Sequence, residues 1–185
     1  MRYFRAGLMT LAAFIFVPVL AALGQTEPHH VGQTIPLTKD LKLDVVTAGL
    51  DAFSKEHIQL TGVAKVFEVR FLKSDANLTV ALEPWNDPAN SGVVLELEDT
   101  RVAPKALAYR TKKSSEGEEV IEVAMVKDLA RNRKTGRGLW LGSSPKPMVQ
   151  LLFDISKEIA DSPAKLRLEI LVDFKQPPII VEIVQ

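Results

Sequence analysis

The chain has 185 residues, of which 46% are hydrophobic and 25% charged, and it contains no cysteine. Its 23 basic and 23 acidic side chains balance, which argues against a nucleic-acid-binding protein, because domains that bind phosphate backbones are usually basic. The lack of cysteine excludes disulfide frameworks, thiolate zinc sites, iron–sulfur clusters and thiol nucleophiles.

Residues 1–24 have the three-part pattern of a secretory signal peptide. Two arginines near the start precede a long apolar run, which ends in the small-residue sequence Ala22-Leu23-Gly24. We therefore expect cleavage before Gln25 and export to the periplasm or the extracellular space. The alternative is an uncleaved membrane anchor that leaves the rest of the chain facing outward, because residues 6–24 approach the roughly 20 residues that span a bilayer.

The mature chain is a series of short strand patterns separated by turn-forming residues. Residues 25–38 predict an exposed lead-in, and a first strand is expected near 33–47. The longest pattern, at 58–73, places Phe67 and Phe71 on one inward face. Further strands are expected at 78–82, 93–99, 106–111, 119–126, 147–155, 164–174 and 179–184.

This pattern predicts an all-β fold. Many short alternating strands with turns between them are typical of a sandwich or barrel, and no long amphipathic helix interrupts them. A parallel α/β sheet is not expected, because it would need crossover helices. We expect one antiparallel β-sandwich of about 7–9 strands in residues 39–185. The residues expected to share its core are Phe67, Val69, Phe71, Phe153, Leu168 and Ile170.

Several short patterns occur together in an order that points to a family. Val31-Gly32 comes first, the strand pattern at 66–72 is followed by Asn77, Tyr109 lies on a later strand, and Phe153-Asp154-Ile155 ends another. In this order they resemble the telokin-like, immunoglobulin-fold domain of many bacterial exported proteins and lipoproteins. The resemblance implies an immunoglobulin-like sandwich in the bacterial envelope or outside the cell. The family is largely without assigned function, and its lipid anchor does not carry over because the chain lacks cysteine.

A basic loop at residues 130–138 is the first candidate binding surface. Four cations lie within seven residues, namely Arg131, Arg133, Lys134 and Arg137. Such a cluster attracts an anionic partner, for example an envelope polymer or an acidic protein face. The alternative is a solvated loop with no partner.

The two tryptophans are the second candidate surface. Trp85 lies in a turn-rich loop and Trp140 directly follows the basic loop. Because tryptophan is enriched at binding hot spots, the pair predicts a contact surface for a sugar or a protein. The alternative is that each tryptophan closes one end of the sandwich.

The residues predict no catalytic or metal centre. His29 and His30 are adjacent in the lead-in and His57 lies far along the chain, so their spacing is unlike that of metal ligands. No nucleophile elbow or glycine-rich phosphate loop is present. We therefore expect no enzyme activity and no cofactor. A hydrolase that uses His57 with a carboxylate is the alternative.

Together these patterns predict an exported, non-catalytic β-sandwich module that binds or scaffolds in the envelope or the extracellular space. The partner is not identified by the sequence. An envelope protein or an anionic envelope polymer fits the basic loop, and no nucleic-acid partner is expected. A membrane contact is expected only if residues 1–24 are retained.

Overall fold

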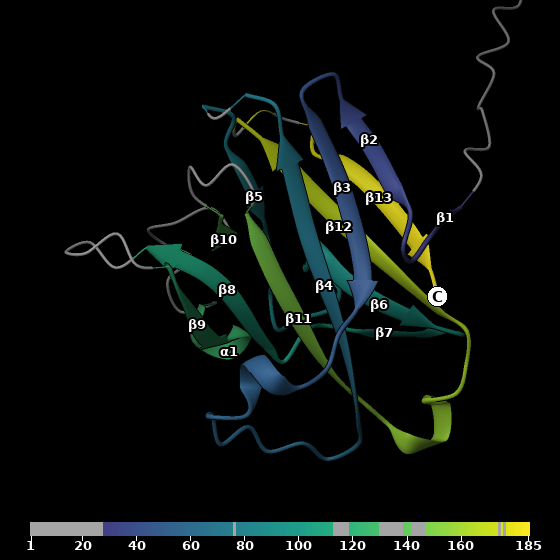
Figure 1. The fold of residues 1–185 in the computed structure, drawn as a ribbon. Coiled ribbons are helices and arrows are strands. Elements are labelled where there is room, and N and C mark those ends of the chain that lie inside the picture. Colours follow the sequence, from purple (N-terminus) through teal and green to yellow (C-terminus); the bar gives the residue numbers. More distant parts are fainter. Residues whose placement is uncertain are drawn as a thin grey trace, which may run out of the picture.

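The computed structural model describes residues 28–75, 77–112, 119–129, 139–141, 147–173, 175 and 177–185, with only the backbone described at 111, 112, 119 and 140. These residues form two β-sheets, one of seven strands and one of six, packed as a β-sandwich (Figure 1). Among the described residues, no helix is both long enough and apolar enough to cross a membrane.

The seven-stranded sheet is built around one long strand, β12. β13 pairs with one edge of β12, while β5 and β6 follow one another along its other edge. All pairings in this sheet are antiparallel except that of β1 with β13. Its strands are β1 (His29–His30), β5 (Val80–Leu82), β6 (Val93–Leu97), β7 (Thr100–Val102), β10 (Leu139–Trp140), β12 (Ala164–Val172) and β13 (Ile179–Val184).

The six-stranded sheet has the order β2-β3-β4-β11-β8-β9 and is antiparallel throughout. Its strands are β2 (Thr34–Thr38), β3 (Leu41–Thr47), β4 (Val63–Lys73), β8 (Ala106–Lys112), β9 (Glu119–Met125) and β11 (Met148–Ile155). The short helical elements within the described ranges are η1 (Asp51–Phe53), α1 (Val126–Leu129) and η3 (Lys157–Ile159).

The main core lies between the sheets. Alternate side chains of each strand point inward, so the apolar periodicity of the sequence becomes a continuous buried layer. Phe67 of β4 and Phe153 of β11 meet edge to face, with ring centroids 6.0 Å apart. The predicted core is confirmed, since each of the six residues is at most 1% exposed: Phe67, Val69, Phe71, Phe153, Leu168 and Ile170.

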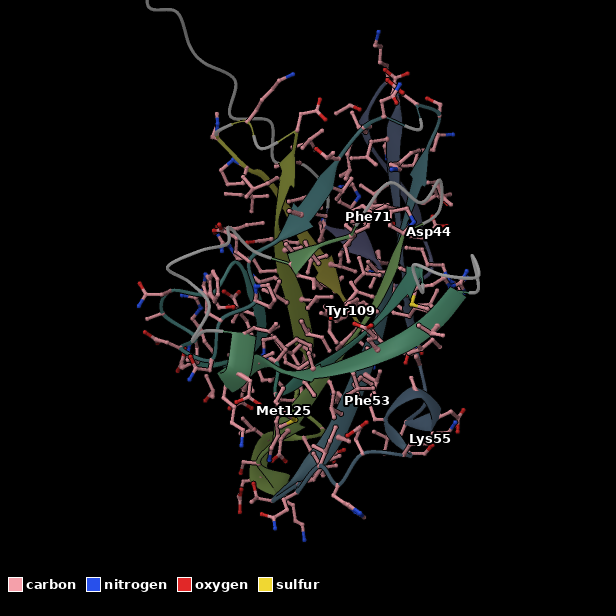
Figure 2. The ribbon with its side chains drawn as sticks, turned by 90° about the vertical axis from the view of Figure 1, so that its left-hand side faces the viewer. Asp44, Phe53, Lys55, Phe71, Tyr109 and Met125 are labelled. Carbon is pink, nitrogen blue, oxygen red and sulfur yellow. The ribbon has the colours of Figure 1, made fainter. Side chains whose placement is uncertain are left out.

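A second, smaller apolar cluster covers the outer face of the six-stranded sheet. Residues 48–62 cross that face between β3 and β4, and Phe53 of η1 is buried there while Lys55 is exposed (Figure 2). The side chains beneath Phe53 come from three neighbouring strands: Val66, Ala106, Ala108 and Leu152. This cluster holds residues 48–62 against the sandwich, which fixes one wall of the cleft described below.

Several boundaries differ from those predicted. The strand expected near 33–47 is a hairpin of two strands, because the chain turns at 39–40. Residues 34–38, expected to end an exposed lead-in, form β2, and Ile35 is buried. Residues 58–62 lie outside β4. The described residues contain 13 strands, more than the predicted 7–9, because several are short edge strands of two or three residues.

Candidate functional site

Most of the site residues predicted from the sequence lie outside the part of the chain that the structure describes. The basic loop, with Arg131, Arg133, Lys134 and Arg137, lies outside the described residues. Trp140 belongs to β10, but its side chain lies outside the described part. Trp85 is only 6% exposed, so it lies inside the protein and offers no contact surface. Its loop folds back on itself, since the Trp85 backbone N–H donates to Ser91 Oγ at 3.0 Å.

The three histidines lie in two separate segments of the chain. His29 and His30 form β1, far in sequence from His57, which is exposed beyond η1. Among the described residues, no group of three or more His, Asp or Glu side chains is placed to hold a metal ion. His57 instead lines a cleft at one end of the sandwich, which the sequence did not indicate.

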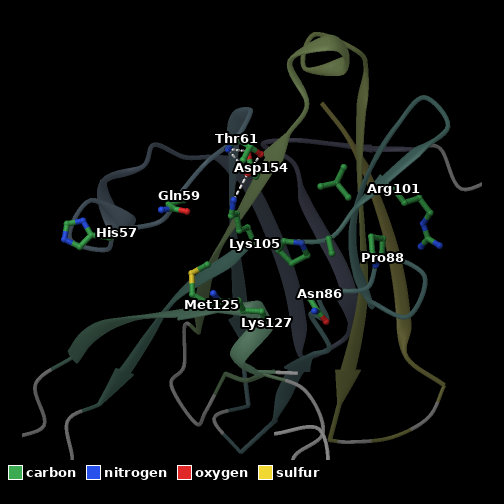
Figure 3. Close-up of a pocket in the computed structure, with 13 residues that line it drawn as sticks. His57, Gln59, Thr61, Asn86, Pro88, Arg101, Lys105, Met125, Lys127 and Asp154 are labelled. Atoms are coloured by element: carbon green, nitrogen blue, oxygen red, sulfur yellow. Dashed lines mark hydrogen bonds and ion pairs between the residues drawn. The ribbon is translucent and has the colours of Figure 1, made fainter. Parts of the chain in front are cut away.

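This cleft has a volume of about 650 Å³ and is partly open to solvent. Such a volume is within the usual range for ligand-binding pockets. Its walls come from five parts of the chain that are distant in sequence (Figure 3). The lining residues are His57, Gln59 and Thr61; Asn86 and Pro88; Arg101, Val102, Ala103, Pro104 and Lys105; and Met125, Lys127 and Asp154.

Asp154 joins two of these walls at the base of the cleft. From one wall, the Thr61 backbone N–H donates to Asp154 Oδ2 at 3.0 Å, and the Gly62 backbone N–H donates to Oδ1 at 2.8 Å. From the other, Lys105 Nζ donates to Oδ2 at 2.6 Å. The Thr61 hydroxyl adds a further donor at 3.1 Å. Asp154 therefore connects strand β11 to both walls.

These contacts set the charge state of Asp154. Burial by itself would raise the pKa of the carboxyl group, because it disfavours the charged form. The hydrogen bonds from Lys105, Thr61 and Gly62 outweigh burial and lower the pKa to about 2. Asp154 is therefore ionised at neutral pH, with both oxygens engaged by donors.

Gly62 permits the close approach that this arrangement needs. A Cβ atom at this position would lie 1.9 Å from the carbonyl oxygen of Ile155, a distance that no side chain tolerates. The backbone of β11 thus passes directly beside Gly62. This contact explains why the strand predicted from residue 58 begins only at Val63: residues 61 and 62 are bound to the end of β11 instead.

Backbone hydrogen bonds join the remaining walls. The Lys105 N–H donates to the carbonyl oxygen of Leu152 at 2.7 Å, and the Val126 N–H donates to the carbonyl oxygen of Lys105 at 3.1 Å. The segment after β7 is thereby attached both to β11 and to the start of α1. Since every wall except the 86–88 loop is joined to Asp154 or to this segment, the cleft is preformed.

The charged side chains of the lining are mostly cationic. Among the described lining residues, Arg101, Lys105 and Lys127 are cations and Asp154 is the one carboxylate. The Asp154 side chain is 10% exposed, against 28% for Lys105 and 42% for Arg101. A molecule that enters the cleft therefore meets positively charged groups first, and the carboxylate lies beneath them.

Few residues of this cleft stand out in the sequence. Asp154 belongs only to the Phe-Asp-hydrophobic pattern, and Arg101, Lys105 and Lys127 belong to no motif. They converge because the pairing of β11 with β4 and β8 places distant turns at the same end of the sandwich.

Comparison of the chain with family models, curated proteins and solved structures finds no match. The resemblance to telokin-like domains therefore stays a prediction.

Proposed function

We propose that this protein is an exported, non-catalytic binding module with an immunoglobulin-like sandwich, and that the cleft at the end of the sandwich is its ligand-binding surface. Export is supported by the signal-peptide pattern of residues 1–24. An envelope or extracellular location follows from that pattern.

The immunoglobulin-like assignment is supported by the path of the chain. Successive strands pass repeatedly between the two sheets: β2 to β4 lie in one, β5 to β7 in the other, and β8 and β9 in the first again. Antiparallel sheets connected in this way are typical of immunoglobulin-like sandwiches, which carry binding loops at their ends.

The observation that carries the binding function is the preformed cleft. The ion pair between Asp154 and Lys105, together with the backbone bonds of Thr61 and Gly62, holds two walls in place without a ligand. A site that is already ordered loses little conformational entropy when it binds. The lining combines apolar side chains such as Val102 and Met125 with polar ones, as is common in ligand pockets.

The alternative of a hydrolase has one observation in its favour, since His57 and Asp154 line the same cleft. A general base or its orienting partner needs a lone pair directed at the proton that moves. Asp154 directs its oxygens to Lys105, Thr61 and Gly62, which favours a structural role for this carboxylate.

The binding proposal is tested by titrating the ¹⁵N-labelled protein with a fragment library of carboxylates, sugars and dipeptides. We expect amide shifts to cluster at cleft residues. Ala103→Trp, which fills the cleft, should abolish them, and Ile180→Trp on the exposed face of β13 should not. Shifts that cluster elsewhere, or that survive in Ala103→Trp, would contradict the proposal. Fragment hydrolysis that is lost in His57→Ala would favour the hydrolase.

A further inference from the structure

We propose that the cleft binds an extended acidic peptide, which adds as a strand to the outer edge of β7 and places its carboxylates among Arg101, Lys105 and Lys127. This inference rests on the proposed function, because it names the ligand class for the same cleft. It follows from three features of the lining: its exposed edge strand, its charge and its apolar groups.

The edge of β7 faces the cleft. Arg101 and Val102 of β7 and the next three residues, 103–105, line it. Successive side chains of a strand point to opposite faces, so Arg101 and Val102 can both line a cavity where β7 presents its edge to that cavity. Among the described strands, β7 pairs only with β6, so its other edge faces no described partner strand.

The pairing register directs backbone groups to that edge. A two-residue turn at Glu98-Asp99 joins β6 and β7, and Glu98 has the positive φ, 49°, of tight hairpin turns. Leu97 and Thr100 flank the turn and form the hydrogen-bonded pair that closes it. Hydrogen-bonded and non-hydrogen-bonded pairs alternate along an antiparallel ladder. The next residue, Arg101, is therefore in a non-hydrogen-bonded pair, and its backbone N–H and C=O point away from β6. They are available to a strand added at this edge.

The cationic groups of the cleft favour an added strand that carries negative charge. Lys105 and Lys127 lie in the middle of the cleft and Arg101 towards one end (Figure 3). Glu96 contacts Arg101 Nε at 3.5 Å but lies closer to Lys165 Nζ, at 2.9 Å. The carboxylate of Glu96 is therefore shared, and the guanidinium of Arg101 retains donors for a ligand carboxylate.

The apolar residues of the lining would contact apolar side chains of an extended peptide. Pro88, Val102 and Met125 present apolar surface between the charged groups. A strand alternates its side chains between two sides, so acidic residues alternating with small apolar ones would meet both kinds of lining.

The test uses three capped hexapeptides that alternate Val with Glu, Gln or Lys, with binding to the mature protein measured by fluorescence anisotropy. We expect the Glu peptide to bind about tenfold more tightly than the Gln peptide, from two or three partly exposed ion pairs, and the Lys peptide not to bind. The preference for Glu should shrink as salt is raised.

Two sets of variants assign the binding to the cleft. The double variant Arg101→Gln with Lys127→Gln should remove most of the preference for Glu over Gln. The matched control, Lys39→Gln with Lys157→Gln, neutralises two exposed lysines outside the cleft and should keep it. Circular dichroism of each variant verifies folding.

Backbone methylation tests strand addition separately from charge. Alternate N–H groups of a strand point to opposite edges. N-methylation at one set of alternate residues in the Glu peptide should abolish binding, and methylation at the other set should not. Equal tolerance of both would overturn strand addition.

The outcomes separate this inference from the proposed function. If fragments shift cleft amides but no peptide binds, or if an anionic oligosaccharide binds and the Glu peptide does not, the acidic-peptide inference is wrong and the binding module stands. If the Glu peptide binds equally well to the Arg101→Gln, Lys127→Gln variant, the cationic selection is wrong. If neither fragments nor peptides bind the cleft, both proposals fail.

Discussion

Asp154 illustrates how one residue can organise the end of a sandwich. It lies on the outward side of β11, where a strand residue is usually solvated, but turns of the chain bring four donors to it. A partly buried carboxylate is favourable only when its oxygens are satisfied, and here they are. The residue thus stabilises the connection between η1 and β4 and orients Lys105 at the base of the cleft.

We expect the stability of the protein to depend on the ionisation of Asp154. The pKa of Asp154 in the folded protein, about 2, lies below its ordinary value of 3.8. The stabilisation is therefore present above about pH 4 and is lost as the pH falls towards 2. Asp154→Asn should lower the free energy of unfolding at pH 7 by about 2 kcal/mol and flatten its pH dependence in that window.

Urea unfolding at several pH values measures this effect. The control is the double variant Asp154→Asn with Lys105→Met, which also removes the cation left without its partner and should recover part of the loss. An unchanged pH profile in Asp154→Asn would show that other carboxyl groups set the acid stability.

At the scale of elements, β11 and β12 are the strands around which the two sheets are built. Each is a central strand of its sheet, and they follow one another along the chain through η3. Central strands are paired on both edges and buried on one or both faces, so they make the largest apolar contribution. The outer elements, including β7 and β9, are paired on one edge among the described strands.

This difference predicts unequal costs for truncating apolar side chains. Phe153→Ala on β11 removes a fully buried ring that packs on Phe67 and should cost about 3–5 kcal/mol in urea unfolding. Ile121→Ala on β9 removes a side chain that is 52% exposed and should cost about 0.5 kcal/mol or less. Similar losses for the two variants would mean that β9 is buried against another surface.

At the scale of the whole molecule, the protein has two separate apolar clusters, one between the two sheets and one on the outer face of the six-stranded sheet. The main core joins the two sheets, and the second cluster attaches residues 48–62 to the outside of one of them. Because this attached segment carries His57, Gln59 and Thr61, the second cluster supports one wall of the cleft. The ligand-binding surface proposed here therefore depends on packing that is separate from the main core.

The exported form of the molecule can be checked directly. If residues 1–24 are a cleaved signal peptide, intact-mass spectrometry of the protein recovered from the periplasm or medium should give a chain starting at Gln25. A mass that includes residues 1–24, found in a membrane fraction, would instead support the outward-facing anchor.

The local sequence determined the strands in which apolar and polar residues alternate clearly. In β4, β11 and β12 apolar residues alternate over many positions, because one side of each strand faces a core, and the inward residues Phe67, Phe153 and Leu168 were predicted correctly. Short edge strands such as β7 and β10 contain too few residues to show a period, and only their pairing with distant strands defines them.

Tertiary structure alone decided the cleft. Its lining residues lie in segments centred near 59, 87, 103 and 126 and on β11, and no local pattern relates them. Gly62 and Asp154 are 92 positions apart, and a hydrogen bond joins them because β11 pairs antiparallel with β4. Alternation is a local consequence of burial on one face, whereas the convergence of turns depends on strand order and register, which are set by contacts between distant parts of the chain.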